Sequence, residues 1–356
     1  MESIILDLPL PEPGDEMEHV GNSGRLAHRI LILFLLILPI PSIIISLFIG
    51  SYGLSPGEVI AGFLAVVTGS GAPGIHITVL MNMRLPRIVL ALLVGAALSV
   101  SGACFQGIFR NPLVSPDILG LSSGAAFGAA LAVSVFYTLP IQVSAFIFSL
   151  VALGIAYLMA YQKGETPVIS LVLSGVITSF VFSALLTAIQ FAINERALQS
   201  IVFWMMGSLN TASWYKVNQA LPWILIGIGG ITMLRWQLNI LALGDDDARS
   251  VGMRTELMKA VLIIFASLAA SAAVAAAGII SLVGLIVPHM VRMIAGPDHR
   301  IVIPLSITVG ASFLVLVDDL SRSLFWFELP VGILTTLVGA PVFMYLMRKT
   351  RTGGWE

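Results

Sequence analysis

Charged residues are scarce in this sequence of 356 residues: lysine, arginine, aspartate and glutamate make up only 10% of it. Soluble globular domains carry about a quarter of such residues, so this chain has too little polar surface to cover a globule in water. Hydrophobic residues make up 58% of the chain, and its mean hydropathy is +1.00. This composition is typical of a polytopic membrane protein.

Cysteine is rare in this chain, and two common binding or catalytic motifs are absent. Cys104 is the only cysteine, which excludes an intrachain disulfide, and its apolar neighbours predict a small buried residue. Neither a phosphate-binding G-x-x-x-x-G-K-[ST] motif nor a zinc-binding H-E-x-x-H motif occurs. His76, His289 and His299 lack the spacing of metal ligands. We therefore expect no catalytic residues, metal site or bound cofactor on this chain, and no nucleic-acid partner.

Apolar segments of about 20 residues, the length that spans a bilayer, predict an all-α membrane protein with a bundle of about ten transmembrane helices. The apolar run 257–294 is too long for one helix, and its glycines and Pro288 indicate a turn near Ser281. The segment 58–68 is too short to span and is expected at the membrane surface. The predicted spans are 30–49, 86–108, 118–136, 139–160, 168–192, 217–234, 257–280, 282–294, 301–317 and 329–347.

The distribution of positive charge predicts the orientation. Ten spans place both termini on one side, and if that side is the cytoplasm, thirteen lysines and arginines lie inside. Only five lie outside, as the positive-inside rule requires: Arg84, Arg87, Arg196, Lys216 and Arg322. Residues 1–24 contain six acidic residues and no lysine or arginine, so we predict an acidic cytoplasmic tail rather than a secretory signal. Residues 25–356 form the ten-helix domain.

Two charged groups stand at the outer ends of predicted spans. Arg84 and Arg87 flank Pro86, which we expect to begin the second span. Asp318 precedes Arg322 by four positions, a spacing that places both on one helix face as an ion pair. Unpaired ionisable groups near the bilayer are costly and often functional. The arginines could dock an acidic partner or reach the lipid headgroups, and the ion pair could equally be a structural clamp.

The most polar stretch between two spans is a cytoplasmic loop after the sixth span. Its acidic residues can cap a short helix that Gly252 ends. Such a helix outside the membrane offers a soluble partner a surface to push against, and an ordinary solvated turn is the alternative. The residues of this segment are Gly244, Asp245, Asp246, Asp247, Ala248, Arg249 and Gly252.

Many short motifs occur together in one order along residues 25–350. They include 84–87 (RLPR), 111–113 (NPL), 116–120 (PDILG), 204–207 (WMMG), 284–289 (GLIVPH) and 339–341 (GAP). In these motifs and their spacing the chain resembles the FecCD-type, BtuC-like permeases of ABC importers, a family that carries iron chelates (siderophores and haem) and vitamin B12. The acidic tail lies outside the family pattern.

This resemblance implies the partners of the chain. The ten-helix permease domain would pair with a second permease subunit, either an identical copy or a paralogue, in the cytoplasmic (inner) membrane and in contact with its lipid. Two separate ATP-binding subunits would hold ATP and Mg²⁺, so the chain itself would be a transport subunit and not an enzyme. An extracytoplasmic substrate-binding protein would deliver the substrate, for which a ferric siderophore is the first choice and haem or cobalamin the alternatives.

The resemblance also implies roles for particular residues. Arginines at the positions of Arg84, Arg87 and Arg322 accept acidic residues of the binding protein. The segment from Gly244 to Gly252 matches the coupling helices that dock on the ATPase. The loop before the fifth span matches the region of the inner gate. Its residues are Glu165, Thr166 and Pro167.

Two other classes of protein remain as alternatives. A secondary transporter carries ionisable groups in interrupted helices near the midplane, whereas here these groups stand at helix ends. An intramembrane enzyme requires a catalytic constellation, and the sequence contains none.

Overall fold

The computed structural model describes residues 28–50, 52–68, 74–324 and 327–350. The predicted acidic tail, 1–24, lies outside these residues. Within the described ranges the chain forms helices, and the only β-pairing is an isolated bridge between Gln162 and Glu165. The chain is therefore an all-α membrane protein.

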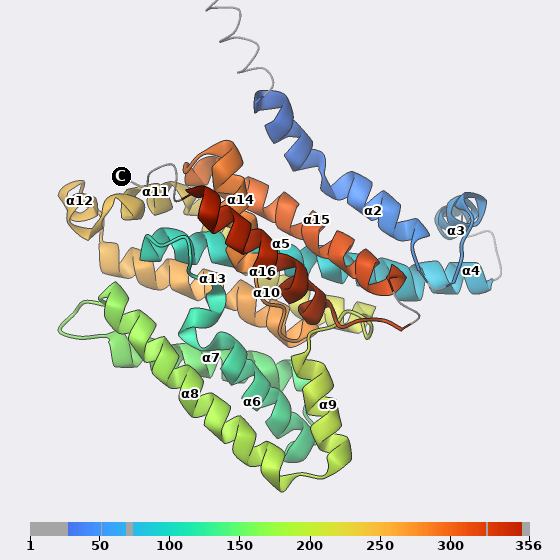
Figure 1. Cartoon of the computed structure of the whole chain (residues 1–356), viewed down its shortest axis with the longest axis horizontal. Coiled ribbons are helices and arrows are strands. Elements are labelled where there is room, and N and C mark those ends of the chain that lie inside the picture. Colours follow the sequence, from blue (N-terminus) through green and yellow to red (C-terminus); the bar gives the residue numbers. More distant parts are fainter. Residues whose placement is uncertain (1–27, 51, 69–73, 325–326, 351–356) are drawn as a thin grey trace, which may run out of the picture.

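The helices form an elongated bundle with two ends (Figure 1). One end carries α12, and we call it the cytoplasmic end, following the predicted orientation. The other end carries α3 and α4, and we call it the outer end. In chain order the helices are α1 (His28–Ile37), α2 (Pro39–Phe48), α3 (Pro56–Thr68), α4 (Ile75–Thr78), η1 (Val79–Arg84), α5 (Leu85–Phe109), η2 (Pro116–Leu119), α6 (Leu121–Ser134), α7 (Ile141–Ala160), α8 (Val168–Ala192), α9 (Glu195–Met205), α10 (Trp214–Met233), α11 (Arg235–Leu243), α12 (Asp245–Ser250), α13 (Thr255–Ala277), α14 (Val283–Ala295), α15 (His299–Ser323) and α16 (Val331–Thr350).

Every predicted span contains one of these helices. Five helices of the described residues are long and apolar enough to cross a membrane, or seven if the bent pairs α1–α2 (43°) and α10–α11 (58°) each form one span. The apolar helices α6, α14 and α16 occupy the other predicted spans. The expected turn near Ser281 is confirmed, because α13 ends at Ala277 and α14 begins at Val283. The count of ten spans and the cytoplasmic location of the termini stay predictions.

Helix α5 forms the centre of the bundle, where its glycines allow two backbones to come into contact. A Cβ atom built on Gly95 would lie 2.2 Å from the carbonyl oxygen of Gly310 in α15. One built on Gly102 would lie 1.8 Å from the carbonyl oxygen of Gly284 in α14. Because lipid gives helices little hydrophobic reason to associate, such close backbone packing is a main source of their attraction. It places α5, α14 and α15 in fixed register.

Pro86 lies in the first turn of α5, as expected, but the helix does not begin there. The segments α4, η1 and α5 form one continuous helix from Ile75 to Phe109. Proline lacks the backbone N–H that would bond the carbonyl four residues earlier, and its ring collides with that carbonyl. The preceding turn, η1, is a π-helix, in which the N–H of Leu85 bonds the carbonyl oxygen of Leu80. This wider turn accommodates the proline and lets the helix extend at the outer end.

We predict that Gly102→Ala lowers the stability of the bundle by about 1–3 kcal/mol or more, because the added methyl group forces α5 away from α14. Gly229→Ala, in α10, is the matched control, since nothing lies within 4 Å of a Cβ built on Gly229. Thermal unfolding of the purified variants in detergent measures the difference. Equal melting temperatures for the two variants would contradict the proposed packing.

Candidate functional site

The three arginines predicted to dock a partner lie at the outer end, and their guanidinium groups are buried. The side chains of Arg87 and Arg322 are 11% and 4% exposed, and Arg84 is buried as well. Arg84 donates hydrogen bonds to the backbone carbonyl oxygens of Leu47 and Tyr52. It therefore ties the segment around the end of α2 to the continuous helix that contains α5.

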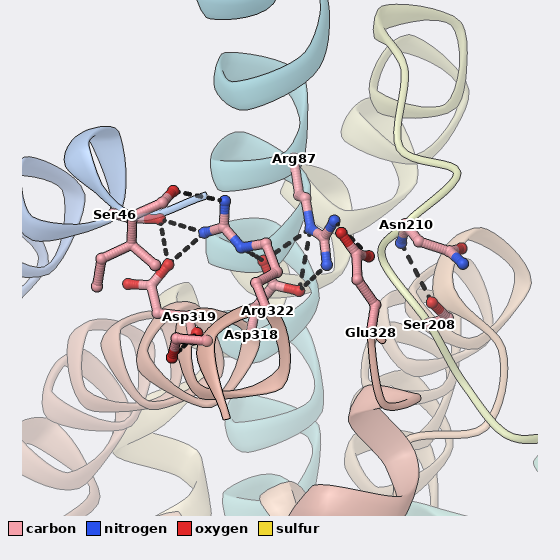
Figure 2. Close-up of polar contacts among 10 residues, drawn as sticks. Ser46, Arg87, Ser208, Asn210, Asp318, Asp319, Arg322 and Glu328 are labelled. Carbon is pink, nitrogen blue, oxygen red and sulfur yellow. Dashed lines mark hydrogen bonds and ion pairs between the residues drawn. The ribbon is translucent and has the colours of Figure 1, made fainter. Parts of the chain in front are cut away.

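Arg87 holds two acidic side chains (Figure 2). Its Nε and Nη2 each donate to the carboxylate of Asp318, at 2.9 Å, and its Nη1 donates to Oε2 of Glu328, also at 2.9 Å. Asp318 is only 2% exposed, whereas Glu328 is 34% exposed. A bidentate pair between buried groups is a strong, oriented contact, so Arg87 fixes α5 against α15.

Arg322 makes the second group of contacts drawn in Figure 2. Its Nε lies 3.3 Å from Oδ2 of Asp318, the ion pair that the spacing predicts, and its Nη2 bonds Asp319. Its Nη1 donates to the carbonyl oxygen of Ile49 at 3.0 Å, and its Nη2 donates to Oγ of Ser46 at 2.9 Å. Ser46 in turn donates to Asp319 at 2.7 Å. Arg322 therefore joins α2 to α15.

Together, the three arginines and the acids Asp318, Asp319 and Glu328 form what we call the outer cluster. Three positive and three negative formal charges balance within it. Figure 2 shows the guanidinium groups of Arg87 and Arg322 pointing to internal acids, and Arg84 donates to backbone carbonyl groups. Such an arrangement stabilises the junction of α2, α5 and α15, which is the clamp considered from the sequence. An acidic partner would have to displace an internal acid to reach an arginine, and the docking role stays a prediction.

Sequence reasoning identified Asp318 but missed Asp319 and Glu328. The signal for Asp319 was a second acidic residue in an otherwise apolar helix, where an unpaired charge would be costly. Glu328 had no comparable signal, because it lies in the connection between α15 and α16 and meets Arg87 only through the fold.

At the cytoplasmic end, the predicted short helix is present as α12. Gly252 follows it with a φ of +82°, the left-handed conformation that favours glycine. The expected side-chain cap is absent: the capping position is Gly244, and no side chain caps the helix. Asp245, which we expected to cap, instead bonds Lys259 of α13.

Lys259 and Glu256, both in the first turns of α13, connect α12 to the loop between α7 and α8. Lys259 is 3% exposed, and its Nζ lies 2.7 Å from Oδ2 of Asp245 and 2.8 Å from Oε1 of Glu256. Glu256 accepts hydrogen bonds from the backbone N–H and the hydroxyl of Thr166, at 2.8 and 2.6 Å. One chain of charged contacts therefore runs from the predicted coupling segment to the predicted gate region. We call it the inner network.

A second, more exposed contact joins the same two segments. Arg249 of α12 donates to Glu165 at 2.8 Å, and this hydrogen bond and the charge of Glu165 raise the pKa of Arg249. Both side chains are about half exposed, so solvent weakens the pair. Pro167 occupies the position just before α8, without a capping hydrogen bond. Sequence reasoning missed Glu256 and Lys259, whose signal was opposite charges three residues apart at the start of an apolar helix.

Comparison with known proteins gives concordant results. The sequence model of the FecCD transport family matches residues 34–349. The chain is 38% identical over 326 residues to the molybdate import permease MolB of Haemophilus influenzae, which covers 91% of this chain and 97% of MolB. It is 40% identical to the cobalamin import permease BtuC of Halobacterium salinarum, over 78% of this chain and 75% of that protein.

Two further similarities concern iron and three-dimensional structure. A permease of Helicobacter pylori, described as that of an iron chelatin transport system, is 39% identical over 77% of this chain and 83% of its own length. The solved structure of an ABC transporter in an inward-facing conformation, described as of metal-chelate type, superposes with a TM-score of 0.79 at 37% identity. That similarity covers 90% of this chain and 99% of the solved one.

Proposed function

This chain belongs to the FecCD transport family, and we propose that it carries an iron chelate, with a ferric siderophore as first choice, through the cytoplasmic membrane. It is the membrane-spanning permease of an ABC importer, as its relatives and structural neighbour are. The finer proposal includes ATP-driven alternating access. The observation that carries this mechanism is the inner network, which links the coupling segment directly to the gate region.

The proposed partners follow from this mechanism. Two separate ATPase subunits hold ATP and Mg²⁺ and contact α12 from the cytoplasm. A second permease subunit, either identical or paralogous, completes the pathway. Support for that partner comes from α8, which leaves most of its surface uncovered by the rest of the chain. Only 28% of its apolar 18-residue stretch is buried, against 83% in the helix that contains α5. An extracytoplasmic binding protein delivers the chelate to the outer end.

The inner network gives the ATPase a physical route to the gate. A displacement of α12 moves Asp245, which is held by the buried Lys259, and Lys259 shares Glu256 with Thr166. A buried charge resists separation from its partner, because breaking such a pair leaves one charge uncompensated. The network therefore transmits motion to the start of α8. ATP and the loaded binding protein then favour different states of the bundle, as any driven conformational change requires.

Docking at the outer end is proposed to proceed by exchange of partners. Glu328 is the most exposed acid of the outer cluster and holds Nη1 of Arg87. An acidic residue of the binding protein can take its place on Arg87 without breaking the buried pair between Arg87 and Asp318. In this proposal Glu328 covers the arginine in the absence of the binding protein.

The substrate is proposed from the family. Members of similar sequence carry names that include molybdate, cobalamin and iron chelatin, and others name hemin and iron(3+)-hydroxamate. Iron-containing substrates recur most often among these names, and the solved relative is described as of metal-chelate type. Cobalamin and haem are the alternatives, and molybdate is a further candidate because of the extent of the match to MolB.

Uptake into proteoliposomes that contain the complete transporter tests this function. We expect ATP-dependent accumulation of a radiolabelled ferric siderophore, delivered by the binding protein, and much slower uptake of labelled cobalamin, hemin and molybdate. Preferential uptake of one of these other compounds would replace the proposed substrate within the same function. Uptake that continues without ATP but stops with a proton uncoupler would instead indicate a secondary transporter.

Coupling is tested by Glu256→Gln, which removes the charge between Lys259 and Thr166. We expect ATP hydrolysis to continue while uptake per ATP falls about tenfold, the effect of losing roughly 1.4 kcal/mol of coupling. Glu165→Gln is the matched control, because it breaks only the exposed contact with Arg249 and should change this ratio less than twofold. Equal ratios in both variants and the wild type would show that the inner network does not transmit the motion.

Docking is tested by Glu328→Gln, which removes the proposed internal competitor for Arg87. We expect the binding protein to bind the reconstituted transporter about fivefold more tightly, as expected for the loss of roughly 1 kcal/mol of partly exposed ion pairing. Glu195→Gln, an exposed acid at the start of α9, controls for the change in net charge. Surface plasmon resonance measures both. Unchanged binding in Glu328→Gln together with unchanged binding in Arg87→Gln would leave the outer cluster as a clamp alone.

A further inference from the structure

A second polar site lies at the cytoplasmic end, apart from the inner network. It is a cavity of about 570 Å³ between α5, α11, α14 and the start of α15. The volume is within the range of small-molecule sites, about 300–1,000 Å³. Its polar lining includes Gln106, Arg110, Asn111, Asn239, Arg292 and His299. Neither transport nor coupling, as proposed above, uses these residues.

The cavity has an excess of positive charge. Arg292 bonds the side-chain oxygen of Gln106 and, at 3.2 Å, the carbonyl oxygen of Ala103, both of which are neutral groups. Among the residues that the structure describes, neither Arg292 nor Arg110 forms an ion pair with a carboxylate. Cations that lack an acid in a largely apolar bundle are suited to bind an anion.

The one acid of the cavity wall, Asp298, is already engaged. It accepts hydrogen bonds from the side chain of Asn239 at 2.7 Å and from the backbone N–H of Arg300 at 2.9 Å. It also lies 3.4 Å from Nε of Arg300. These contacts lower the pKa of Asp298, and the hydrogen bond from the backbone N–H of Arg300 has the largest effect. The contacts of Asp298 are thus with groups other than Arg110 and Arg292.

His299 supplies an unused polar atom in the same wall. The residue is 4% exposed, and its Nδ1 lies 2.9 Å from Oδ1 of Asn239. Because the amide nitrogen of Asn239 donates to Asp298, the amide oxygen faces the imidazole, so Nδ1 carries the hydrogen. The lone pair of Nε2 has no hydrogen-bond partner among the described residues. It faces Gly107, another wall residue, on which a built Cβ would lie 2.7 Å away.

The residues around the cavity indicate that it lies at the level of the lipid headgroups. Helix α11, which contributes Asn239, bends by 58° away from α10. On it the half-exposed ring of Trp236 lies 4.1 Å from the guanidinium carbon of Arg300. Exposed tryptophan next to arginine is typical of the membrane–water interface. Basic pockets between transmembrane helices on the cytoplasmic side are suited to anionic lipid headgroups.

We propose that this cavity binds the headgroup of an anionic phosphoglycerol lipid, with phosphatidylglycerol as the simplest case. The phosphate lies against Arg110 and Arg292, and a glycerol hydroxyl donates to Nε2 of His299. The bound lipid joins α5, α11, α14 and α15. It also lies beside the coupling segment, because Nη1 of Arg110 is 3.2 Å from a Cβ built on Gly244. This proposal is independent of which substrate is carried.

Native mass spectrometry of the purified complete transporter tests it, with equimolar phosphatidylglycerol and phosphatidylethanolamine added in detergent. We expect the wild type to retain phosphatidylglycerol at least tenfold in excess, and Arg110→Gln and Arg292→Gln each to reduce that excess by about fivefold or more. Among the described residues the side chain of Arg110 forms no hydrogen bond or ion pair that its loss would break, so a folding defect in Arg292→Gln would leave Arg110→Gln informative. Arg235→Gln, at the other end of α11, should retain the excess.

Three outcomes would overturn the proposal. The first is an equal loss in Arg235→Gln, which would indicate a general effect of surface charge. The second is a failure of phosphatidylglycerol to bind the complete transporter while the ATPase subunit crosslinks to residue 110. That result would make the cavity a protein interface. The third is that free glycerol phosphate displaces the lipid at equal concentration, which would assign the same phosphate-binding groups to a soluble ligand.

Discussion

Charge inside an apolar helical bundle has to be neutralised by the bundle itself, because neither lipid nor distant water can do so. At the outer end this requirement fixes the structure: the buried carboxylate of Asp318 is reached by Arg87 from α5 and by Arg322 from its own helix. The arginines then meet Glu328 and Asp319, and the formal charges balance. The positions of α2, α5 and α15 relative to one another depend on this balance, and a glycine contact between the backbones of α5 and α15 adds to it.

The two ends of the bundle use the same chemistry with different consequences. In the outer cluster most partners are buried, and the contacts close on themselves, which favours rigidity. In the inner network a single buried lysine, Lys259, forms ion pairs with Asp245 in α12 and with Glu256 in α13. Glu256 in turn accepts a hydrogen bond from Thr166 in the loop before α8. A linear chain of contacts between separate segments is suited to transmit a displacement, whereas a closed cluster resists one. This contrast fits the proposed coupling role of the inner network, whereas the docking role of the outer cluster stays a prediction.

Much of the fold could be predicted from the sequence. Hydropathy indicated a helix for each apolar segment, glycine and proline indicated the turn between α13 and α14, and the polar loop after α10 and α11 indicated the short helix α12. The spacing of Asp318 and Arg322 gave an ion pair within one helix. Pro86 lies in the first turn of α5, as expected, but the sequence did not indicate that a π-turn joins α5 to the helix before it. The side-chain cap expected of Asp245 failed because Lys259 offered it a stronger partner.

The sequence by itself therefore determined what depends on near neighbours: which segments are apolar, where helices break, and which charges share a helix face. The tertiary structure alone decided which distant groups meet. Arg87 and Asp318 are separated by 231 positions, Ser46 and Asp319 by 273, and Thr166 and Glu256 by 90. No local pattern encodes these pairs, because the first two result from the approach of α5 and α2 to α15, and the third from the approach of the loop before α8 to α13. Burial then makes each pair obligatory, since a charge that is removed from water must find its partner within reach.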